Sequence, residues 1–143
     1  MNMKKIVIFG ATGNVGSYVH KYACEYFKDR YEVIASGHRQ TDFFEKQGQK
    51  YVSVDISKAE DFDKLPQEDV YAVIDLAAQI PSYMKGYHPE KYVQSNIMGA
   101  YNVLEYCRKV HADRILFSTT VFDISLSATN GAVLKPDMPY NFS

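Results

Sequence analysis

The chain has 143 residues, 46% of them hydrophobic and 23% charged, with a formal net charge of −1. This size and composition are typical of one globular domain with its own core, and a charge near zero favours neither a nucleic acid nor an anionic membrane surface as a partner. Since no signal peptide is recognisable and no apolar run reaches the roughly 18 residues that span a bilayer, we expect a cytoplasmic protein that does not bind membranes.

The first element is an apolar run that stops on a glycine. The β-branched and aromatic residues from Ile6 to Phe9 predict a strand buried on both faces. The run continues as Gly10-Ala11-Thr12-Gly13-Asn14-Val15-Gly16, a Gly-x-x-Gly-x-x-Gly sequence that leads into a helix. In a dinucleotide site the first glycine allows the tight turn, the second lets backbone N–H groups approach a pyrophosphate, and the third lets the helix pack closely. We therefore predict nucleotide binding here, and the alternative is a glycine-rich turn that only joins strand to helix.

The helix after the glycines carries apolar residues at three- and four-residue spacing, which predicts one buried face. The residues expected on that face are Val15, Tyr18, Val19, Tyr22, Ala23, Tyr26 and Phe27. A second strand is predicted at 31–35 and a third at 51–54. Between them we expect a short helix that is capped by Thr41 and runs through Gln47, with Gly48 at its C-terminal end.

The rest of the chain continues this alternation of strand and helix. We predict a polar helix at 57–65, a strand at 71–77, a loop at 79–89, the longest helix at 90–110 and a fifth strand at 114–117. The inward residues expected on the longest helix are Tyr92, Val93, Ile97, Ala100, Tyr101, Leu104 and Cys107. The alternation predicts a parallel sheet with right-handed crossovers and helices on both faces, and ligands bind beyond the carboxyl ends of such strands.

The end of the second strand normally reads the ribose of a dinucleotide, about 20 residues past the glycines. An acid there would bind the 2′-hydroxyl and repel a 2′-phosphate, but this chain has Ser36-Gly37-His38-Arg39 and no acid before Asp42. Arg39 can pair with a 2′-phosphate and stack on adenine, so the sequence favours NADP, with NAD as the alternative. The other interpretation of Arg39 is a solvated loop arginine.

The third and fourth strands end in further candidate residues. Asp55 can accept a hydrogen bond from the adenine amino group, with Ile56 against the ring, or it can be a helix N-cap. Asp75 lies inside an apolar strand, where a carboxylate needs partners, and we expect backbone donors of the glycine loop to supply them. Ala77 and Ala78 are small enough to let the cofactor ribose pass over them.

The fifth strand ends in Ser118-Thr119-Thr120, beside the expected nicotinamide. A hydroxyl at this position can hydrogen-bond a substrate carbonyl. Ordinary turn chemistry is the alternative explanation for three hydroxyls after a strand.

Four motifs in order resemble the extended short-chain dehydrogenase/reductase superfamily, of the NAD(P)-dependent epimerase/dehydratase type. The loop at 10–16 is similar to its Gly-x-x-Gly-x-x-Gly signature, and Asp75-Leu76-Ala77-Ala78 is similar to its His-Leu-Ala-Ala turn without the histidine. Residues 96–105 follow its Asn-x-x-Gly-x-x-Asn-x-Leu-Glu helix, and Phe117-Ser118-Thr119-Thr120 resembles its strand-five hydroxyl cluster. The resemblance runs from residue 4 to about residue 123.

This resemblance implies a Rossmann-type, doubly wound α/β/α domain at 1–123 and an irregular tail at 124–143, with the C-terminal strands and the substrate domain missing. It implies hydride transfer at a sugar-like or other secondary alcohol or ketone, with NADP or NAD and a small-molecule substrate as partners. A homo-oligomer is compatible with it, and no metal is implied. Together with the strand ends, the expected cofactor-binding residues are Gly10, Thr12, Gly13, Asn14, Val15, Gly16, Arg39, Asp55, Ile56, Leu76, Ala77, Ala78 and Asn96.

The catalytic set of that superfamily is a Ser or Thr after strand five and a Tyr-x-x-x-Lys pair on the next helix. The tyrosine is the general acid/base, the lysine lowers its pKa, and the hydroxyl orients the carbonyl. Here Thr120 or Thr119 corresponds to the hydroxyl, whereas Tyr140 is the last tyrosine and no lysine follows it. Either Tyr140 is the catalytic tyrosine without its lysine or the pair lies in a longer protein, so we expect this chain alone to be inactive. The alternatives are a non-enzymatic, NADP-binding redox sensor of the NmrA-like kind and an inactive fragment.

Overall fold

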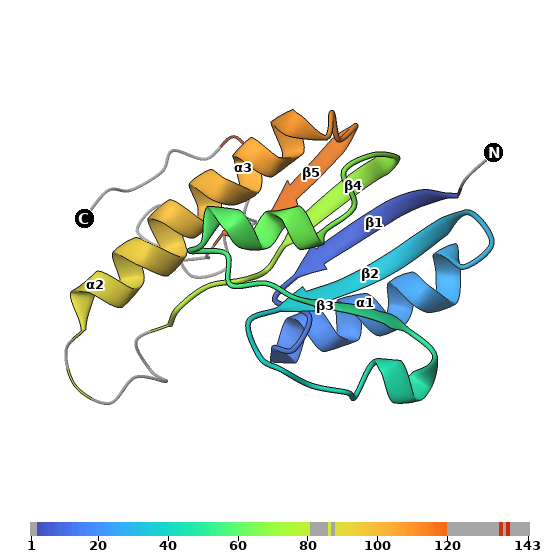
Figure 1. Cartoon of the computed structure of the whole chain (residues 1–143), viewed down its shortest axis with the longest axis horizontal. Coiled ribbons are helices and arrows are strands. Elements are labelled where there is room, and N and C mark those ends of the chain that lie inside the picture. The colour runs from blue at the N-terminus through green and yellow to red at the C-terminus, as the bar shows by residue number, and fades with distance from the viewer. Residues whose placement is uncertain (1–2, 81–85, 87, 120–134, 136, 138–143) are drawn as a thin grey trace.

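Five parallel strands form a single sheet in the order β3-β2-β1-β4-β5 (Figure 1). The computed structural model describes residues 3–80, 86, 88–119, 135 and 137. The strands are β1 (Lys4–Phe9), β2 (Tyr31–Gly37), β3 (Lys50–Ser53), β4 (Val70–Asp75) and β5 (Arg114–Phe117). Every predicted strand is therefore present, with its ends shifted by a residue or two, and the parallel pairing is confirmed.

The strand order changes direction at β1. Strands β2 and β3 lie on one side of β1, while β4 and β5 lie on the other. The carboxyl ends of β1 and β4 are thus the switch point at which open parallel sheets bind their ligands.

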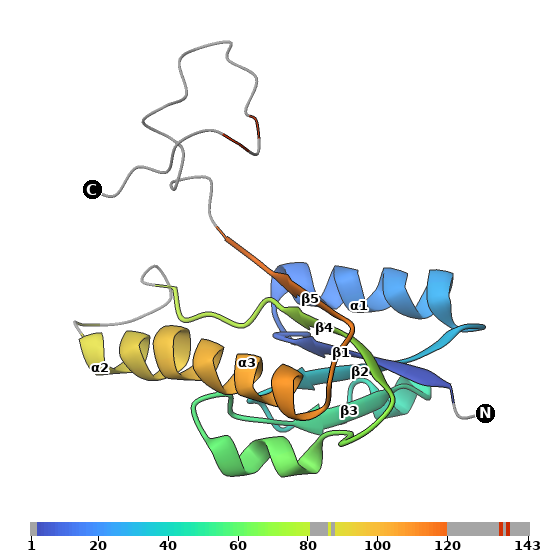
Figure 2. The ribbon, with the colours of Figure 1, turned by 90° about the horizontal axis from the view of Figure 1, so that it is seen from above.

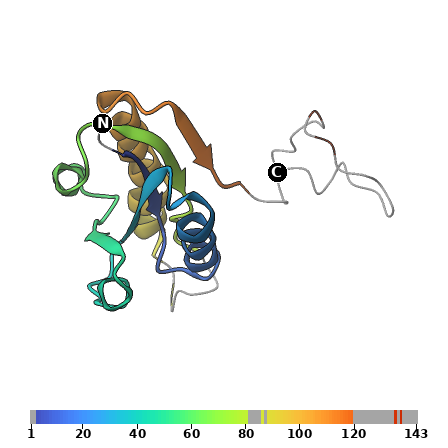
Figure 3. The same ribbon diagram turned by 90° about the vertical axis from the view of Figure 1, so that its right-hand side faces the viewer.

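Helices cover both faces of the sheet (Figure 2 and Figure 3). The helix α1 (Asn14–Phe27) lies on one face. The other face carries the 3₁₀-helix η2 (Ala59–Lys64) and a continuous run of α2 (Pro89–Tyr92), the π-helical η4 (Val93–Met98) and α3 (Gly99–Lys109). This arrangement confirms the expected three-layer, Rossmann-type fold.

The central strand β1 contributes alternate residues to two separate cores. Ile6 and Ile8 pack with residues of α1, whereas Val7 and Phe9 pack with residues of α3 and η2. All four side chains are buried, as a strand covered on both faces requires.

The predicted short helix after β2 is only one 3₁₀ turn, η1 (Glu45–Gln47). It ends at Gly48, whose φ of 68° is the left-handed conformation that favours glycine. Before it, the Thr41 hydroxyl accepts a hydrogen bond of 3.2 Å from the Phe43 N–H, a local turn in place of a first helical turn.

The buried face of α1 differs from the predicted one. Gly16, His20 and Ala23 are its buried residues. Five of the seven residues expected to point inward are exposed: Val15, Tyr18, Tyr22, Tyr26 and Phe27. The physical reason is close approach, since a Cβ at Gly16 would lie 2.1 Å from the Gly10 carbonyl oxygen, and only small side chains fit against the sheet there.

The buried face of the long helix also differs from the predicted one. Its buried residues are Gly99, Asn102, Val103 and Tyr106. Four of the residues expected to point inward are exposed instead: Val93, Ile97, Tyr101 and Leu104. Periodicity identifies an apolar stripe on this helix, but most of that stripe does not face the sheet. The face that does contains a glycine and a buried asparagine.

The structure contains no helix, over the segments it describes, that combines the length and the apolar character needed to cross a membrane.

Candidate functional site

The glycine loop is pressed against the segment that follows β4. Gly10 has a φ of 76°, and a Cβ at this position would lie 2.7 Å from the carbonyl carbon and oxygen of Leu76 and 2.9 Å from the Ala77 nitrogen. The Gly13 N–H donates a hydrogen bond of 2.9 Å to the Gly10 carbonyl, which closes the turn. The first glycine and Gly16 therefore have the steric roles that the sequence predicts.

The amino end of α1 fits an anionic group. Gly13, Asn14 and Val15 are exposed, and no side chain caps the first turn. No acidic residue occupies that turn. The first N–H groups of a helix have no carbonyl partner within it and lie at the positive end of its dipole, so this end can receive phosphate oxygens.

A residue of β3 holds the segment after β2, for which the sequence predicts contact with the ribose. The Tyr51 hydroxyl lies 2.9 Å from the Gly37 carbonyl oxygen and also within hydrogen-bonding distance of the Arg39 carbonyl oxygen. Burial raises the pKa of Tyr51, and the positive charge of Arg39 partly opposes that shift. Arg39 itself is exposed, as both interpretations of it require.

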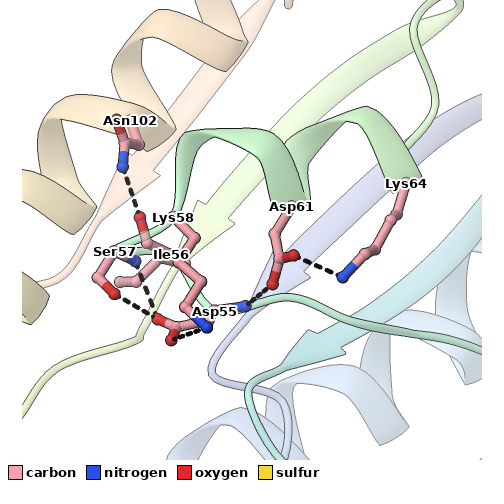
Figure 4. Close-up of polar contacts among 7 residues, drawn as sticks. All are labelled: Asp55, Ile56, Ser57, Lys58, Asp61, Lys64 and Asn102. Atoms are coloured by element: carbon pink, nitrogen blue, oxygen red, sulfur yellow. Dashed lines mark hydrogen bonds and ion pairs between the residues drawn. The ribbon is translucent and has the colours of Figure 1, made fainter.

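Asp55 organises its own loop (Figure 4). Its Oδ1 accepts hydrogen bonds from the Ser57 N–H at 3.1 Å and the Ser57 hydroxyl at 2.7 Å. Its own N–H donates to Asp61 Oδ2 at 2.8 Å, and the Lys64 ammonium and this N–H together hold the pKa of Asp61 below its usual range. The alternative prediction, that Asp55 is a helix N-cap, is wrong. The helix η2 begins only at Ala59, and Asp55 forms an Asx-type turn before it.

Ile56 lies between this loop and the long helix. Its side chain is buried on Gly99, where an added Cβ would lie 2.6 Å from the Ile56 Cδ1. The Asn102 amide donates a hydrogen bond of 2.8 Å to the Ile56 carbonyl (Figure 4). Contact of Ile56 with an adenine ring stays a prediction, since most of the side chain is used for packing.

Asp75 obtains a different partner from the one expected. It is 2% exposed, and its Oδ1 accepts a 3.0 Å hydrogen bond from the Ala77 N–H rather than from the glycine loop. Burial raises the pKa of Asp75, and the Ala77 N–H only partly offsets this. The carboxylate therefore shapes the turn at Leu76 and Ala77, the segment that Gly10 contacts.

Asn96 holds the loop after β4 from the π-helical segment η4. Its Oδ1 accepts from the Gln79 N–H at 2.7 Å, and its Nδ2 donates to the Gln79 carbonyl at 3.0 Å. Both polar atoms of the amide are thus used by one backbone unit, so Asn96 fixes the segment that continues from Ala77 and the exposed Ala78.

The hydroxyl cluster lies at the same edge of the sheet. The Ser118 N–H donates a hydrogen bond of 3.2 Å to the Asp75 carbonyl, which continues the β4–β5 pairing. Thr119, the next residue, is exposed. Thr120 and Tyr140 lie outside the described residues.

The structure adds Tyr51 and Asn102 to the residues around the site. Tyr51 has no sequence signal of its own, because its role depends on which strand lies beside it. Asn102 is the second asparagine of the motif at 96–105, but that motif alone does not identify the Ile56 carbonyl as its partner. Five candidate residues follow the carboxyl ends of strands, and all lie at the same edge of the sheet, as the parallel topology predicts. They are Gly10, Gly13, Arg39, Asp55 and Thr119.

Comparison with known proteins gives a family model and related structures. The model of the NAD dependent epimerase/dehydratase family matches residues 6–141. An uncharacterised protein of Methanocaldococcus jannaschii is 20% identical over 132 residues, which are 84% of this chain and 40% of that protein.

Among solved structures, UDP-glucuronic acid 4-epimerase of Bacillus cereus, in complex with NAD, has a TM-score of 0.72 at 25% identity and covers 96% of this chain. UDP-glucose 4-epimerase of Thermus thermophilus, also in complex with NAD, has a TM-score of 0.73 at 21% identity and covers 96% of this chain. The present chain covers 46% of the first protein and 44% of the second, so it spans less than half the length of either.

Proposed function

The chain belongs to the NAD-dependent epimerase/dehydratase family, and we propose that it forms the dinucleotide-binding part of an oxidoreductase of this kind. The observation that carries the proposal is the glycine loop. Gly10 and Gly16 permit backbone contacts that no larger residue allows, and they lead into a helix end that is exposed, uncapped and free of acidic side chains.

We propose the following division of the site. Backbone N–H groups at the start of α1 bind the pyrophosphate, with the loop residues Gly10, Thr12, Gly13, Asn14, Val15 and Gly16 around it. Asp55 and Ile56 lie at the adenine end. Leu76, Ala77 and Ala78 pass under the ribose, while Asn96 holds the continuation of that segment.

The reaction we propose is hydride transfer at a sugar-like or other secondary alcohol or ketone. When bound, the nicotinamide supplies the hydride acceptor or donor. Thr119 or Thr120 orients the reacting oxygen by a hydrogen bond from its hydroxyl. The sugar-like substrate is supported by the family and by the sugar-nucleotide epimerases among the related structures.

For the dinucleotide we propose NADP, although the two related epimerase structures contain NAD. Arg39 supports this choice, because a guanidinium can form two hydrogen bonds to a phosphate. The segment between Gly37 and Arg39 contains no carboxylate that would bind a 2′-hydroxyl and repel that phosphate.

Titration of the chain with NADPH and with NADH, followed by nicotinamide fluorescence, tests the proposal. We expect both to bind and NADPH to bind more tightly. Asn14→Asp serves as a matched variant, because it introduces a charge at nearly constant shape where we place the pyrophosphate. It should raise the dissociation constants of both dinucleotides by about tenfold or more. Thermal stability should not fall, since an acidic residue is favourable at a helix N-terminus. Failure of the unaltered chain to bind either dinucleotide would contradict the proposal.

A further inference from the structure

Tyr51 connects the middle of β3 to the segment that reads the ribose. It pairs in register with Ala35 of β2. Its ring stacks on Phe44, with centroids 5.0 Å apart and planes 2° from parallel. Since Phe44 is buried, the ring has a fixed support, and its hydroxyl is held at the carbonyl oxygens of Gly37 and Arg39.

The same hydroxyl is close to the glycine loop. A Cβ at Gly37 would lie 3.3 Å from the Tyr51 hydroxyl and 2.9 Å from the Thr12 hydroxyl. Gly37 is buried between these two side chains, so the loop that we assign to the pyrophosphate and the segment that carries Arg39 meet at one point. The segment that carries Arg39 therefore begins at a residue packed against the glycine loop.

Arg39 depends on this support. Its side chain is exposed, and within the described residues no ion pair or side-chain hydrogen bond fixes its guanidinium. A long side chain on an unsupported loop loses conformational entropy when it binds a ligand, and that loss weakens binding. The single hydrogen of the Tyr51 hydroxyl is shared by two carbonyl oxygens two residues apart, and this contact orders the backbone before the ligand arrives.

We propose that Tyr51 is a positioning residue that favours a 2′-phosphorylated dinucleotide, because its hydroxyl holds the backbone on both sides of His38 so that Arg39 faces the phosphate. This inference rests on the proposed dinucleotide site. It goes beyond that site by assigning cofactor preference to a residue of β3 that does not itself contact the dinucleotide.

Tyr51→Phe tests the inference, because it removes only the hydroxyl and keeps the ring on Phe44. Loss of one hydrogen bond should raise the dissociation constant of NADPH by about three- to tenfold and change that of NADH by no more than about twofold. The matched control is Tyr106→Phe on the other face of the sheet. It also removes a tyrosine hydroxyl from a backbone carbonyl, that of Pro66 at 2.6 Å, and should leave the NADPH/NADH ratio unchanged.

The ratio of the NADPH affinity to the NADH affinity distinguishes a positioning role of Tyr51 from a general structural effect. If Tyr51→Phe weakens both dinucleotides equally, or leaves NADPH binding as it is in the unaltered chain, the inference is overturned while the dinucleotide site stands. If the unaltered chain binds neither dinucleotide, the proposed function fails, and the inference fails with it. Melting temperatures of the three proteins show whether each variant is folded at the titration temperature.

Discussion

At the scale of single residues, the proposed preference for NADP depends on Arg39. The side chain is exposed just after β2. We expect Arg39→Ala to weaken NADPH about tenfold or more, since a charge-assisted hydrogen bond contributes roughly 1.5–3 kcal/mol, and to leave NADH within about twofold. Arg30→Ala, an exposed arginine before β2, is the control and should change neither affinity in the same fluorescence titration. An equal loss for both dinucleotides would show that Arg39 supports the loop rather than a phosphate.

Asp75 gives a prediction about pH. Burial raises its pKa in the folded protein, so the folded state holds the proton more tightly than the unfolded chain does. Stability therefore falls as the pH rises from the ordinary carboxyl pKa through the raised value. Asp75→Asn keeps the acceptor for the Ala77 N–H without the charge. Urea unfolding from about pH 4 to about pH 8 should show a flatter pH dependence and a gain of about 1 kcal/mol at neutral pH. A variant less stable than the parent at neutral pH would contradict this account.

At the scale of elements, the strands can be predicted from the sequence and the buried helix faces cannot. Each strand contains a short run of β-branched, aliphatic or aromatic residues between turn signals, and this combination favours a strand. On α1 two stripes compete, and the one with Gly16 and Ala23 faces the sheet because the helix approaches too closely for Tyr18 or Tyr22. The contacts of Tyr51 likewise depend on strand register, which local patterns do not contain.

The long helix yields a prediction about stability. Asn102 is 9% exposed and donates 2.8 Å to the Ile56 carbonyl. Asn102→Ala would leave that carbonyl without its partner in a buried site, so we expect the free energy of unfolding to fall by about 2 kcal/mol in urea titrations followed by circular dichroism. Asn96→Ala is the comparison. Its hydrogen bonds to Gln79 are exposed and can be replaced by water, so it should cost less than about 1 kcal/mol. Equal losses would mean that burial does not decide the strength of these bonds.

At the scale of the whole molecule, the topology explains why residues far apart in the sequence lie together at the proposed site. Parallel strands all end at the same edge, so the loops after β1, β2, β3 and β4 meet there although they are far apart in the sequence. This much follows from the alternation of strand and helix. The hydrogen bonds that adjust the loops, such as those of Asn96 and Tyr51, do not, because they join elements that only the folded sheet brings together.

The exposed apolar surface of the molecule gives the last prediction. A groove of about 550 Å³ runs along α1, with Tyr18, Tyr22 and Ile74 in its walls. Next to β4, every residue of β5 is exposed, and within the described residues β5 pairs with β4 alone. Leu116 lies opposite Ile74 in the β4–β5 register, so the groove and the open strand form one continuous surface.

Apolar patches and open strand edges of this kind promote association. We therefore expect the chain to associate with a second copy in sedimentation experiments over a range of concentrations. Tyr22→Lys and Leu116→Lys each place a charge on this surface and should shift the equilibrium toward monomer, by about tenfold in dissociation constant. Leu104→Lys on α3 is the matched control, because Leu104 is equally exposed but lies on the opposite face of the sheet. A shift with Leu104→Lys alone would move the contact to α3, and a monomer at every concentration would show that neither surface drives association.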